Sequence, residues 1–152
     1  MGWVLVETII RCAHTEDIMR VERFLEDAGL SKDGVQASIE YFLLMEDHLG
    51  DMKATLGIEP HGKAGLLRSL VMRPNCTEKD LFLLFEQILL LARDRQLKTL
   101  YLASNKKSSL EIFRLIGFTE EIIENLPAEL FQSEHVKYIS TVDNSFFLKL
   151  SI

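Results

Sequence analysis

Cysteine is scarce in this sequence, and its two cysteines form no recognisable motif. Cys12 and Cys76 are far apart and lie in neither a CxxC pair nor a Cys/His spacing typical of metal sites. We therefore expect no disulfide framework and no metal site, and free thiols suit a reducing cytosol.

Linkers and repeats are also missing. The three prolines stand singly, and no Pro/Gly/Ser-rich tract or internal repeat interrupts the chain. Hydrophobic residues make up 47% and charged residues 26%, which is typical of a globular domain that buries its own core. We predict a single domain over residues 1–152.

Long apolar runs and basic clusters are missing as well. The most apolar stretch, residues 81–92, contains Glu86 and Gln87 and falls short of the roughly 20 residues that cross a bilayer. Seventeen basic against 23 acidic residues give a net charge of −6, so we predict neither a membrane segment nor a nucleic-acid partner. Residues 1–6 lack the basic segment and cleavage site of a signal peptide, and we expect a cytoplasmic protein.

The order of hydrophobic patterns predicts an α/β (α+β) fold with a mixed, mostly antiparallel central sheet flanked by helices. A helix over 77–96 links strands over 65–72 and 99–103, which must then be parallel neighbours. The other predicted elements are a strand at 8–12, a helix at 15–29, strands at 39–45 and 52–58, a helix at 108–117, strands at 118–123 and 145–150, and a short helix near 127–131.

Two helix starts carry capping patterns. Thr77-x-x-Asp80 predicts a self-capped start, in which an acidic side chain meets the positive end of the helix dipole. Ser108-x-x-Glu111 predicts a capping box, and Gly117 supplies a left-handed stop to that helix.

Three strings stand in a characteristic order: 57–62 with 65–74, then 92–102, then the F-x-x-x-G-F of 113–118. Together they resemble the GCN5-related N-acetyltransferase (GNAT) family, and the resemblance extends over 8–150. Residues 67–70 and 117–118 are particularly similar to its N-acetylglutamate-synthase-like or arsenic-resistance-associated branch.

The resemblance implies acetyl transfer from acetyl-CoA to an amine. In the family, the backbone of the fourth strand pairs with the pantetheine arm of coenzyme A and polarises the thioester carbonyl. Here that backbone belongs to Leu70, Val71 and Met72, which suit a plain core strand equally well. Asn105 follows the fifth strand, where the family uses an Asn to bind pantetheine, and a simple turn role is the alternative.

The pyrophosphate loop departs from the family pattern, which reads (Gln/Arg)-x-x-Gly-x-(Gly/Ala). Counted from the proline at 74, its three positions hold Thr77, Asp80 and Phe82, so the loop is degenerate, and a count one residue shorter restores no glycine. Either Glu78 and Asp80 repel the phosphates, or Thr77 Oγ, Lys79 and backbone N–H groups still bind them. Each charge pair at about 6 Å costs about 0.7 kcal/mol in a water-like dielectric.

Glu59 and Arg68 are the candidate catalytic and substrate-binding side chains. Glu59 ends a strand where family members often place the general base, and a solvated Glu is the alternative. Arg68 shares a strand face with Leu66 and Leu70 by alternation, and it either anchors a substrate carboxylate or forms a structural ion pair.

The general acid is missing from its family position. Phe113 stands where many members carry the Tyr that protonates the leaving thiolate, and neither Tyr101 nor Tyr138 can be assigned to that role. The histidines share no metal or catalytic spacing and are expected on the surface or in loops: His14, His48, His61 and His135.

The helix over 81–91 is apolar on nearly every face. Phe82, Phe85 and Leu89 exceed what one side of a sheet covers, so either neighbouring elements or the second subunit of a homodimer covers them. Two functions remain open: an acetyl-CoA-dependent N-acetyltransferase acting on a small amine or amino acid, or a non-catalytic GNAT-fold protein that serves as a binding or regulatory module. Binding of acetyl-CoA distinguishes them.

Overall fold

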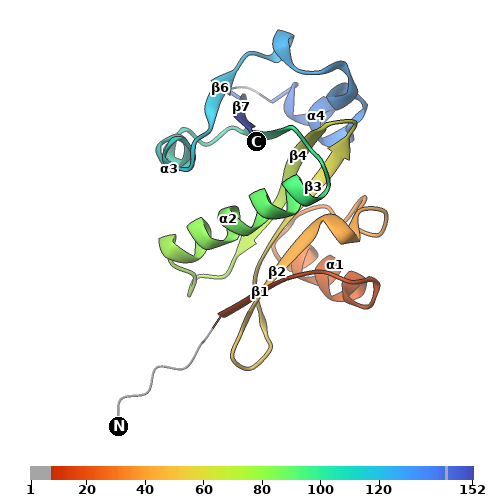
Figure 1. Ribbon diagram of the computed structural model, residues 1–152, viewed down its shortest axis with the longest axis vertical. Helices are drawn as coiled ribbons and strands as arrows, with labels where there is room; N and C mark the ends of the chain where they lie inside the picture. The colour runs from red at the N-terminus through yellow and green to blue at the C-terminus, as the bar shows by residue number, and fades with distance from the viewer. Residues whose placement is uncertain (1–7, 143) are drawn as a thin grey trace. The chain divides into compact units, whose positions relative to one another are not determined.

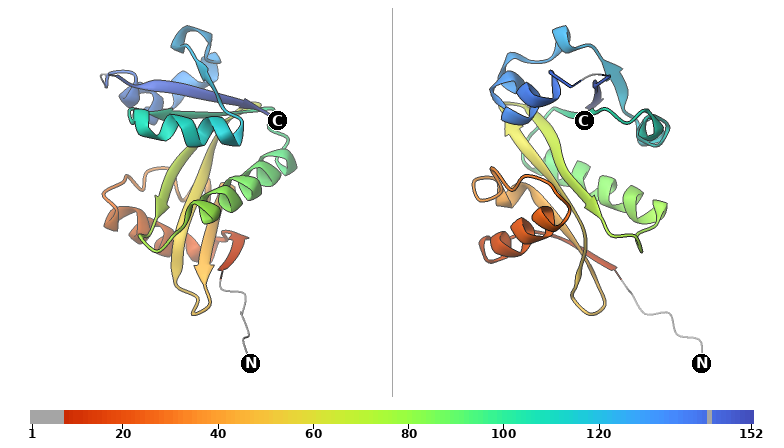
Figure 2. Two further views of the ribbon diagram at one scale, coloured as in Figure 1. Left: turned by 90° about the vertical axis from the view of Figure 1, so that its left-hand side faces the viewer. Right: turned by 180° about the vertical axis from the view of Figure 1, so that it is seen from behind.

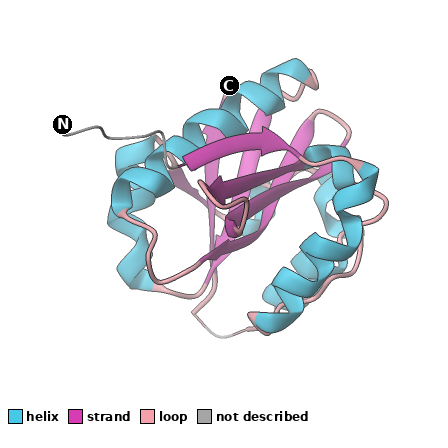
Figure 3. Ribbon diagram, turned by 90° about the horizontal axis from the view of Figure 1, so that it is seen from below, coloured by secondary structure: helices cyan, strands magenta, loops and turns pink. Residues whose placement is uncertain are grey.

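The computed structural model describes residues 8–142 and 144–152, in which three consecutive strands separate the first two α-helices (Figures 1 and 3). Segment 1–6, on which the targeting expectation rests, lies outside the described residues. The strands and α-helices are β1 (Thr8–Cys12), α1 (Ile18–Asp27), β2 (Phe42–Asp47), β3 (Met52–His61), β4 (Ala64–Met72), α2 (Glu78–Asp94), β5 (Thr99–Ser104), α3 (Leu110–Ile116), β6 (Thr119–Glu121), α4 (Glu134–Ile139) and β7 (Phe146–Ser151).

The described strands form one seven-stranded sheet in the order β1-β2-β3-β4-β5-β7-β6. Neighbouring pairs β1–β2, β2–β3, β5–β7 and β6–β7 are antiparallel, whereas β4 and β5 are parallel. In the parallel register Ala64 lies opposite Thr99 and Leu66 opposite Tyr101. The predicted fold class and the predicted parallel pair around the α2 crossover are both confirmed.

The chain divides into two compact units. The first unit comprises 1–58 and 68–88, and the second comprises 59–67 and 89–152. Strands β3 and β4 and helix α2 each contribute residues to both units. The expectation of one domain over 1–152 stays a prediction.

The core of the first unit forms where α1 packs on β2. Helix α1 buries Val21, Phe24 and Leu25, which join Phe42 and Leu44 of β2 in one apolar cluster. Gly57 of β3 permits this packing, because a Cβ atom there would lie 2.5 Å from the Phe42 ring. A methyl group at this position would therefore require the buried Phe42 ring to shift.

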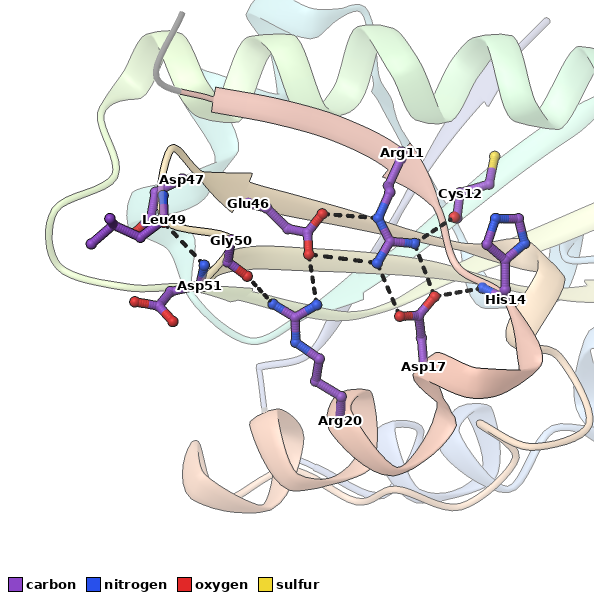
Figure 4. A network of polar contacts seen from close by, with 10 residues as sticks. All are labelled: Arg11, Cys12, His14, Asp17, Arg20, Glu46, Asp47, Leu49, Gly50 and Asp51. Carbon is purple, nitrogen blue, oxygen red and sulfur yellow. Dashed lines mark hydrogen bonds and ion pairs between the residues drawn. The ribbon is translucent and has the colours of Figure 1, made fainter.

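A polar network joins β1, α1 and β2 within the first unit (Figure 4). The Arg11 guanidinium donates two 2.9 Å hydrogen bonds to the Asp17 carboxylate and one of 2.8 Å to Glu46. Arg20 also donates to Glu46, at 2.6 Å, and to the carbonyl of Gly50. The bond from Arg11 lowers the pKa of Asp17 to about 2, although burial opposes ionisation.

The C-terminal elements of the second unit can be followed by colour in Figure 2, from β5 through α3 and β6 to α4 and β7. Leu66 of β4 and Tyr101 of β5 are both buried in the core of this unit. The other members come from the C-terminal elements and β4: Ala64, Leu126, Leu130, Val136, Ile139 and Phe147.

Several predicted elements need correction. Residues Ile39–Tyr41 form a 3-10 turn before β2, and Pro60 and His61 extend β3 instead of lying in a turn. Helix α4 was not predicted. The Ser108–Glu111 capping box is wrong, because the 3-10 turn Lys107–Ser109 precedes α3 and makes Ser109 its N-cap residue.

The predicted stop of α3 is confirmed. Gly117 follows the helix with φ 123, a backbone conformation that side-chain-bearing residues rarely adopt. Its N–H donates to the carbonyls of Phe113 and Arg114, which closes the last turn.

Candidate functional site

The start of α2, where the sequence resemblance leads us to expect a pyrophosphate loop, is capped by its own side chains. The Asp80 carboxylate accepts the backbone N–H of Thr77 at 2.9 Å, and Thr77 Oγ1 accepts the N–H of Asp80 at 3.2 Å. The predicted self-capped start is confirmed. Thr77 therefore uses its backbone N–H and one acceptor site of its hydroxyl within the cap, while Lys79 is exposed.

Lys53 of β3 completes this cluster. Its ammonium lies 3.1 Å from Asp80 Oδ2, and its backbone carbonyl accepts the N–H of Arg73 at 3.0 Å and the thiol of Cys76 at 3.3 Å. The connection between β4 and α2 is thus tied to β3. Sequence reasoning missed Lys53, because no local pattern relates it to a helix start that follows much later in the chain.

The cluster shifts two ionisation equilibria. Burial opposes ionisation of Asp80, but the Thr77 N–H and the Lys53 ammonium outweigh it and hold the pKa of Asp80 below its usual range. Burial raises the pKa of the Cys76 thiol, and the Asp80 carboxylate adds to the effect. At neutral pH, Asp80 is consequently a carboxylate and Cys76 a thiol.

The second half of β4 contains a backbone irregularity. Ser69 adopts φ 60, a left-handed conformation that non-glycine residues seldom occupy. Leu70, Val71 and Met72, whose backbone is the predicted pantetheine-binding segment, follow it directly and are half-buried. Residues in a left-handed conformation inside strands concentrate at functional sites, so Ser69 supports residues 70–72 as a candidate functional segment.

Arg68 lies in the first unit with its guanidinium directed at backbone carbonyls. It donates to the carbonyl of Asp33 and, at 3.3 Å, to that of Ser31, and its Nε donates to Ser69 Oγ at 2.9 Å. Its guanidinium carbon also lies 5.9 Å from the centre of the Phe42 ring. In this arrangement Arg68 fastens the loop after α1 to β4.

In the second unit, Glu59 and His61 form a pair at the end of β3. Their side chains lie two residues apart on one strand, and His61 Nε2 donates to Glu59 Oε1 at 2.6 Å. Both are largely buried, with side-chain exposures of 12% for His61 and 21% for Glu59. The expectation of a surface or loop position is therefore wrong for His61, and its spacing from Glu59 on a strand was the signal for the pair.

The other candidate residues of the second unit differ from this pair in their burial and contacts. Asn105 is exposed after β5. Phe113 is a core residue whose ring meets Phe118 edge-on at 6.1 Å. Tyr101 is buried, and burial with the nearby Glu121 charge raises its pKa, whereas Tyr138 is 66% exposed.

Helix α2 buries some of its apolar side chains and leaves others exposed. Phe85 is buried and Phe82 half-buried in the first unit, whereas Leu90 in the second unit is 52% exposed. Whether a second copy covers such residues stays a prediction.

Residues 8–142 and 144–152 contain neither a bilayer-spanning helix nor a cluster of metal ligands. No helix there combines the length and apolar character that crossing a bilayer would need. In the same part of the chain, no cluster of three or more His, Cys, Asp or Glu side chains is placed to hold a metal ion.

Sequence comparison identifies one curated relative. The uncharacterized protein YwlB of Bacillus subtilis (strain 168) is 36% identical over 127 residues, which cover 83% of this chain and 85% of YwlB. No family model matches the chain.

Structural comparison identifies acetyltransferases. N-acetylglutamate synthase from Neisseria gonorrhoeae, solved with coenzyme A and N-acetyl-glutamate, superposes with a TM-score of 0.74 at 21% identity, covering 97% of this chain and 36% of the synthase chain. Rv2747 from Mycobacterium tuberculosis, solved with coenzyme A, gives 0.75 at 19% identity, covering 95% and 99%. An acetyltransferase of the GNAT family from Staphylococcus aureus Mu50 gives 0.69 at 12% identity, covering 95% and 98%. This chain thus has the GNAT fold, and it spans only about a third of the synthase.

Proposed function

The chain belongs to the family of the Bacillus subtilis protein YwlB and has the GNAT fold, and on these two findings we propose that it is an acetyl-CoA-dependent N-acetyltransferase. The observation that carries the proposal is the fold, since it matches coenzyme A complexes over 95% of the chain or more. The acceptor is a small amine or an amino acid, and the reaction takes place in the cytoplasm.

The proposed reaction forms an amide and releases a thiol. The acceptor nitrogen attacks the thioester carbonyl carbon, a C–N bond forms and the C–S bond breaks. The backbone of Leu70, Val71 and Met72 binds the pantetheine arm, and an N–H there polarises the carbonyl. The left-handed Ser69 supports this assignment, because it redirects the backbone just before these residues.

Glu59 is the general base in this proposal. Its carboxylate accepts the acceptor's proton, directly or through a water molecule. The hydrogen bond from His61 Nε2 supports this role, because it fixes the orientation of the carboxylate. His61 is accordingly a positioning residue.

Arg68 and Asn105 keep their proposed binding roles with different support. Arg68 already donates to the carbonyls of Ser31 and Asp33, so a substrate carboxylate bound by Arg68 would share the guanidinium with the 31–34 loop. Asn105 is exposed and accessible to pantetheine.

The test is acetyl transfer by the full chain to a panel of amino acids and small amines, followed as thiol release from acetyl-CoA. Replacing Glu59 by Gln is expected to lower turnover by about 10²-fold with little change in coenzyme A affinity, because the two tasks use different groups. Glu124→Gln, at an exposed position of the same unit, is the matched control. Equal turnover in Glu59→Gln would remove Glu59 from the mechanism.

One observation favours the alternative, a non-catalytic binding or regulatory module. The Thr77–Asp80 cap engages groups that a donor phosphate would use. Absence of acetyl-CoA binding in calorimetry, together with absence of transfer to every amine, would support the module.

A further inference from the structure

Two contacts at the start of α2 converge on one carboxylate, that of Asp80. Asp80 Oδ2 accepts the N–H of Thr77 at 2.9 Å and lies 3.1 Å from Lys53 Nζ. Asp80 returns a hydrogen bond from its own N–H to Thr77 Oγ1, and its exposure is only 8%. The first N–H of the cap and the neighbouring cation are therefore both engaged with an anion of the chain itself.

The segment that precedes Thr77 is itself held in place by hydrogen bonds to β3. Lys53 belongs to β3, and its carbonyl binds the N–H of Arg73 and the thiol of Cys76, just before Thr77. Because the segment 73–76 is fixed to β3, a small loop movement does not separate Asp80 from its contacts. Release of the carboxylate breaks the cap and the ion pair together.

A diphosphate at this position meets the Asp80 carboxylate, which already engages the Thr77 N–H and the Lys53 ammonium. Its oxygens would stand beside the Asp80 carboxylate, where water is largely excluded and repulsion is several-fold stronger than in bulk solvent. Glu78, exposed in the same turn, adds a second negative charge. The exposed Lys79 offsets the charge of Glu78, and Asp80 already neutralises the positive end of the helix dipole, so the turn offers a diphosphate little net attraction.

We infer that the start of α2 does not receive the diphosphate of a coenzyme A donor, and that the substrate class is acyl-pantetheine thioesters recognised without their nucleotide. The inference rests on the proposed acetyltransferase function. The C–N bond that forms, the C–S bond that breaks and the proton that passes from the amine through the base to the sulfur all lie within the acyl-pantetheine and acceptor groups. The nucleotide is thus dispensable for the chemistry.

The deciding experiment compares the affinity of the full chain for coenzyme A and for pantetheine by calorimetry. We expect the two dissociation constants to agree within about threefold, and inorganic pyrophosphate not to displace coenzyme A. Coenzyme A binding about 30-fold tighter than pantetheine, or displacement by pyrophosphate, would overturn the inference and leave the proposed function standing. If neither compound binds, the proposed function fails and the inference fails with it.

Single-residue variants test whether the charge of Asp80 limits the affinity for coenzyme A. Asp80→Asn keeps an acceptor for the Thr77 N–H but removes the charge, and we expect coenzyme A affinity to rise about tenfold with pantetheine affinity unchanged. Glu78→Gln removes an equal but exposed charge and should change affinity by less than about twofold. An Asp80→Asn variant that behaves like Glu78→Gln would contradict the inference.

Lys53→Gln provides a second test that does not depend on folding of the Asp80 variant. Because the Lys53 ammonium is engaged with Asp80, its removal should leave coenzyme A affinity unchanged. A loss of about tenfold or more would show that Lys53 binds the diphosphate, and the inference would be wrong.

Discussion

The segments that begin α1 and α2 share one arrangement. In the 3-10 turn Thr15–Asp17, which leads directly into α1, the Asp17 carboxylate accepts the N–H of His14 at 2.8 Å, and at α2 the Asp80 carboxylate accepts the N–H of Thr77 at 2.9 Å. In both, the aspartate stands three residues after the N–H that it accepts, and its exposure is 5% for Asp17 and 8% for Asp80. Both caps lie in the first unit.

The two caps differ in the cation that faces them. Arg11 gives Asp17 two parallel hydrogen bonds and also binds Glu46, whereas Lys53 gives Asp80 a single ammonium contact. A planar guanidinium fixes a carboxylate in orientation, and an ammonium acts as a point charge. The comparison teaches that a buried internal carboxylate is a recurring way of starting helices in this unit, so the cap of α2 needs no ligand to explain it.

The largest expected effect comes from Asp17→Ala. It removes the cap, worth about 1 kcal/mol, and leaves Arg11 without its bidentate partner, which costs about 2 kcal/mol more. We expect the free energy of unfolding to fall by about 3 kcal/mol in urea denaturation at neutral pH. Asp17→Asn, which keeps an acceptor for the His14 N–H, should recover about 1 kcal/mol. An unchanged stability would show that the α1 cap is not the stronger one.

Acid should weaken the Asp17 cap selectively. The pKa of Asp17 is about 2 in the fold against an ordinary value of 3.8, so its contribution is complete above the ordinary value and is lost as the pH falls toward 2. At about 1.4 kcal/mol per pKa unit, the wild type should lose about 2 kcal/mol that Asp17→Asn does not lose. Denaturation of both proteins between about pH 5 and pH 2 measures the difference, and parallel stability curves would contradict it.

A smaller effect is expected from Asp80→Ala. The cap and the largely buried ammonium contact of Lys53 are lost, and we expect about 2 kcal/mol of destabilisation in the same urea assay. A loss equal to that of Asp17→Ala would remove the difference between the two cations.

The smallest effect is expected from Glu78→Gln. Glu78 is exposed in the first turn of α2, where it interacts with the helix dipole alone, and the change should cost about 0.3 kcal/mol at low salt and less at high salt. A salt-independent loss above about 1 kcal/mol would show that Glu78 shares in the cap.

The same two segments show how far the sequence could predict the structure. Thr77-x-x-Asp80 is a local pattern with its donor and acceptor three residues apart, and it predicted the α2 cap correctly. The cations could not be predicted, because Arg11 and Lys53 come from strands whose positions depend on long-range packing. Ser108-x-x-Glu111 fits the same local rule and was wrong, since a 3-10 turn shifted the helix start by one residue.

The fold was more predictable than the candidate site. Runs such as 8–12 and 65–72 have the right period and length for strands, and these strands formed almost as expected. The Glu59–His61 contact depends instead on β3 continuing past Pro60. Pro60 and the nearby glycine predicted a turn at this point, so the predicted strand ended at residue 58. Ser69 gave no signal, because a left-handed serine is imposed by its surroundings and not by its own preference.

The hydrogen bond from the Cys76 thiol to the Lys53 carbonyl allows the opening rate of the segment before α2 to be measured. Cys12 is exposed and Cys76 is half-buried, with its thiol bonded to the Lys53 carbonyl and its pKa raised by burial. A thiol reagent consequently reacts with Cys12 at once and with Cys76 only when this contact opens. The slow phase of labelling reports how often the segment held by the α2 cap is released, and its acceleration in Asp80 variants connects the cap to local motion.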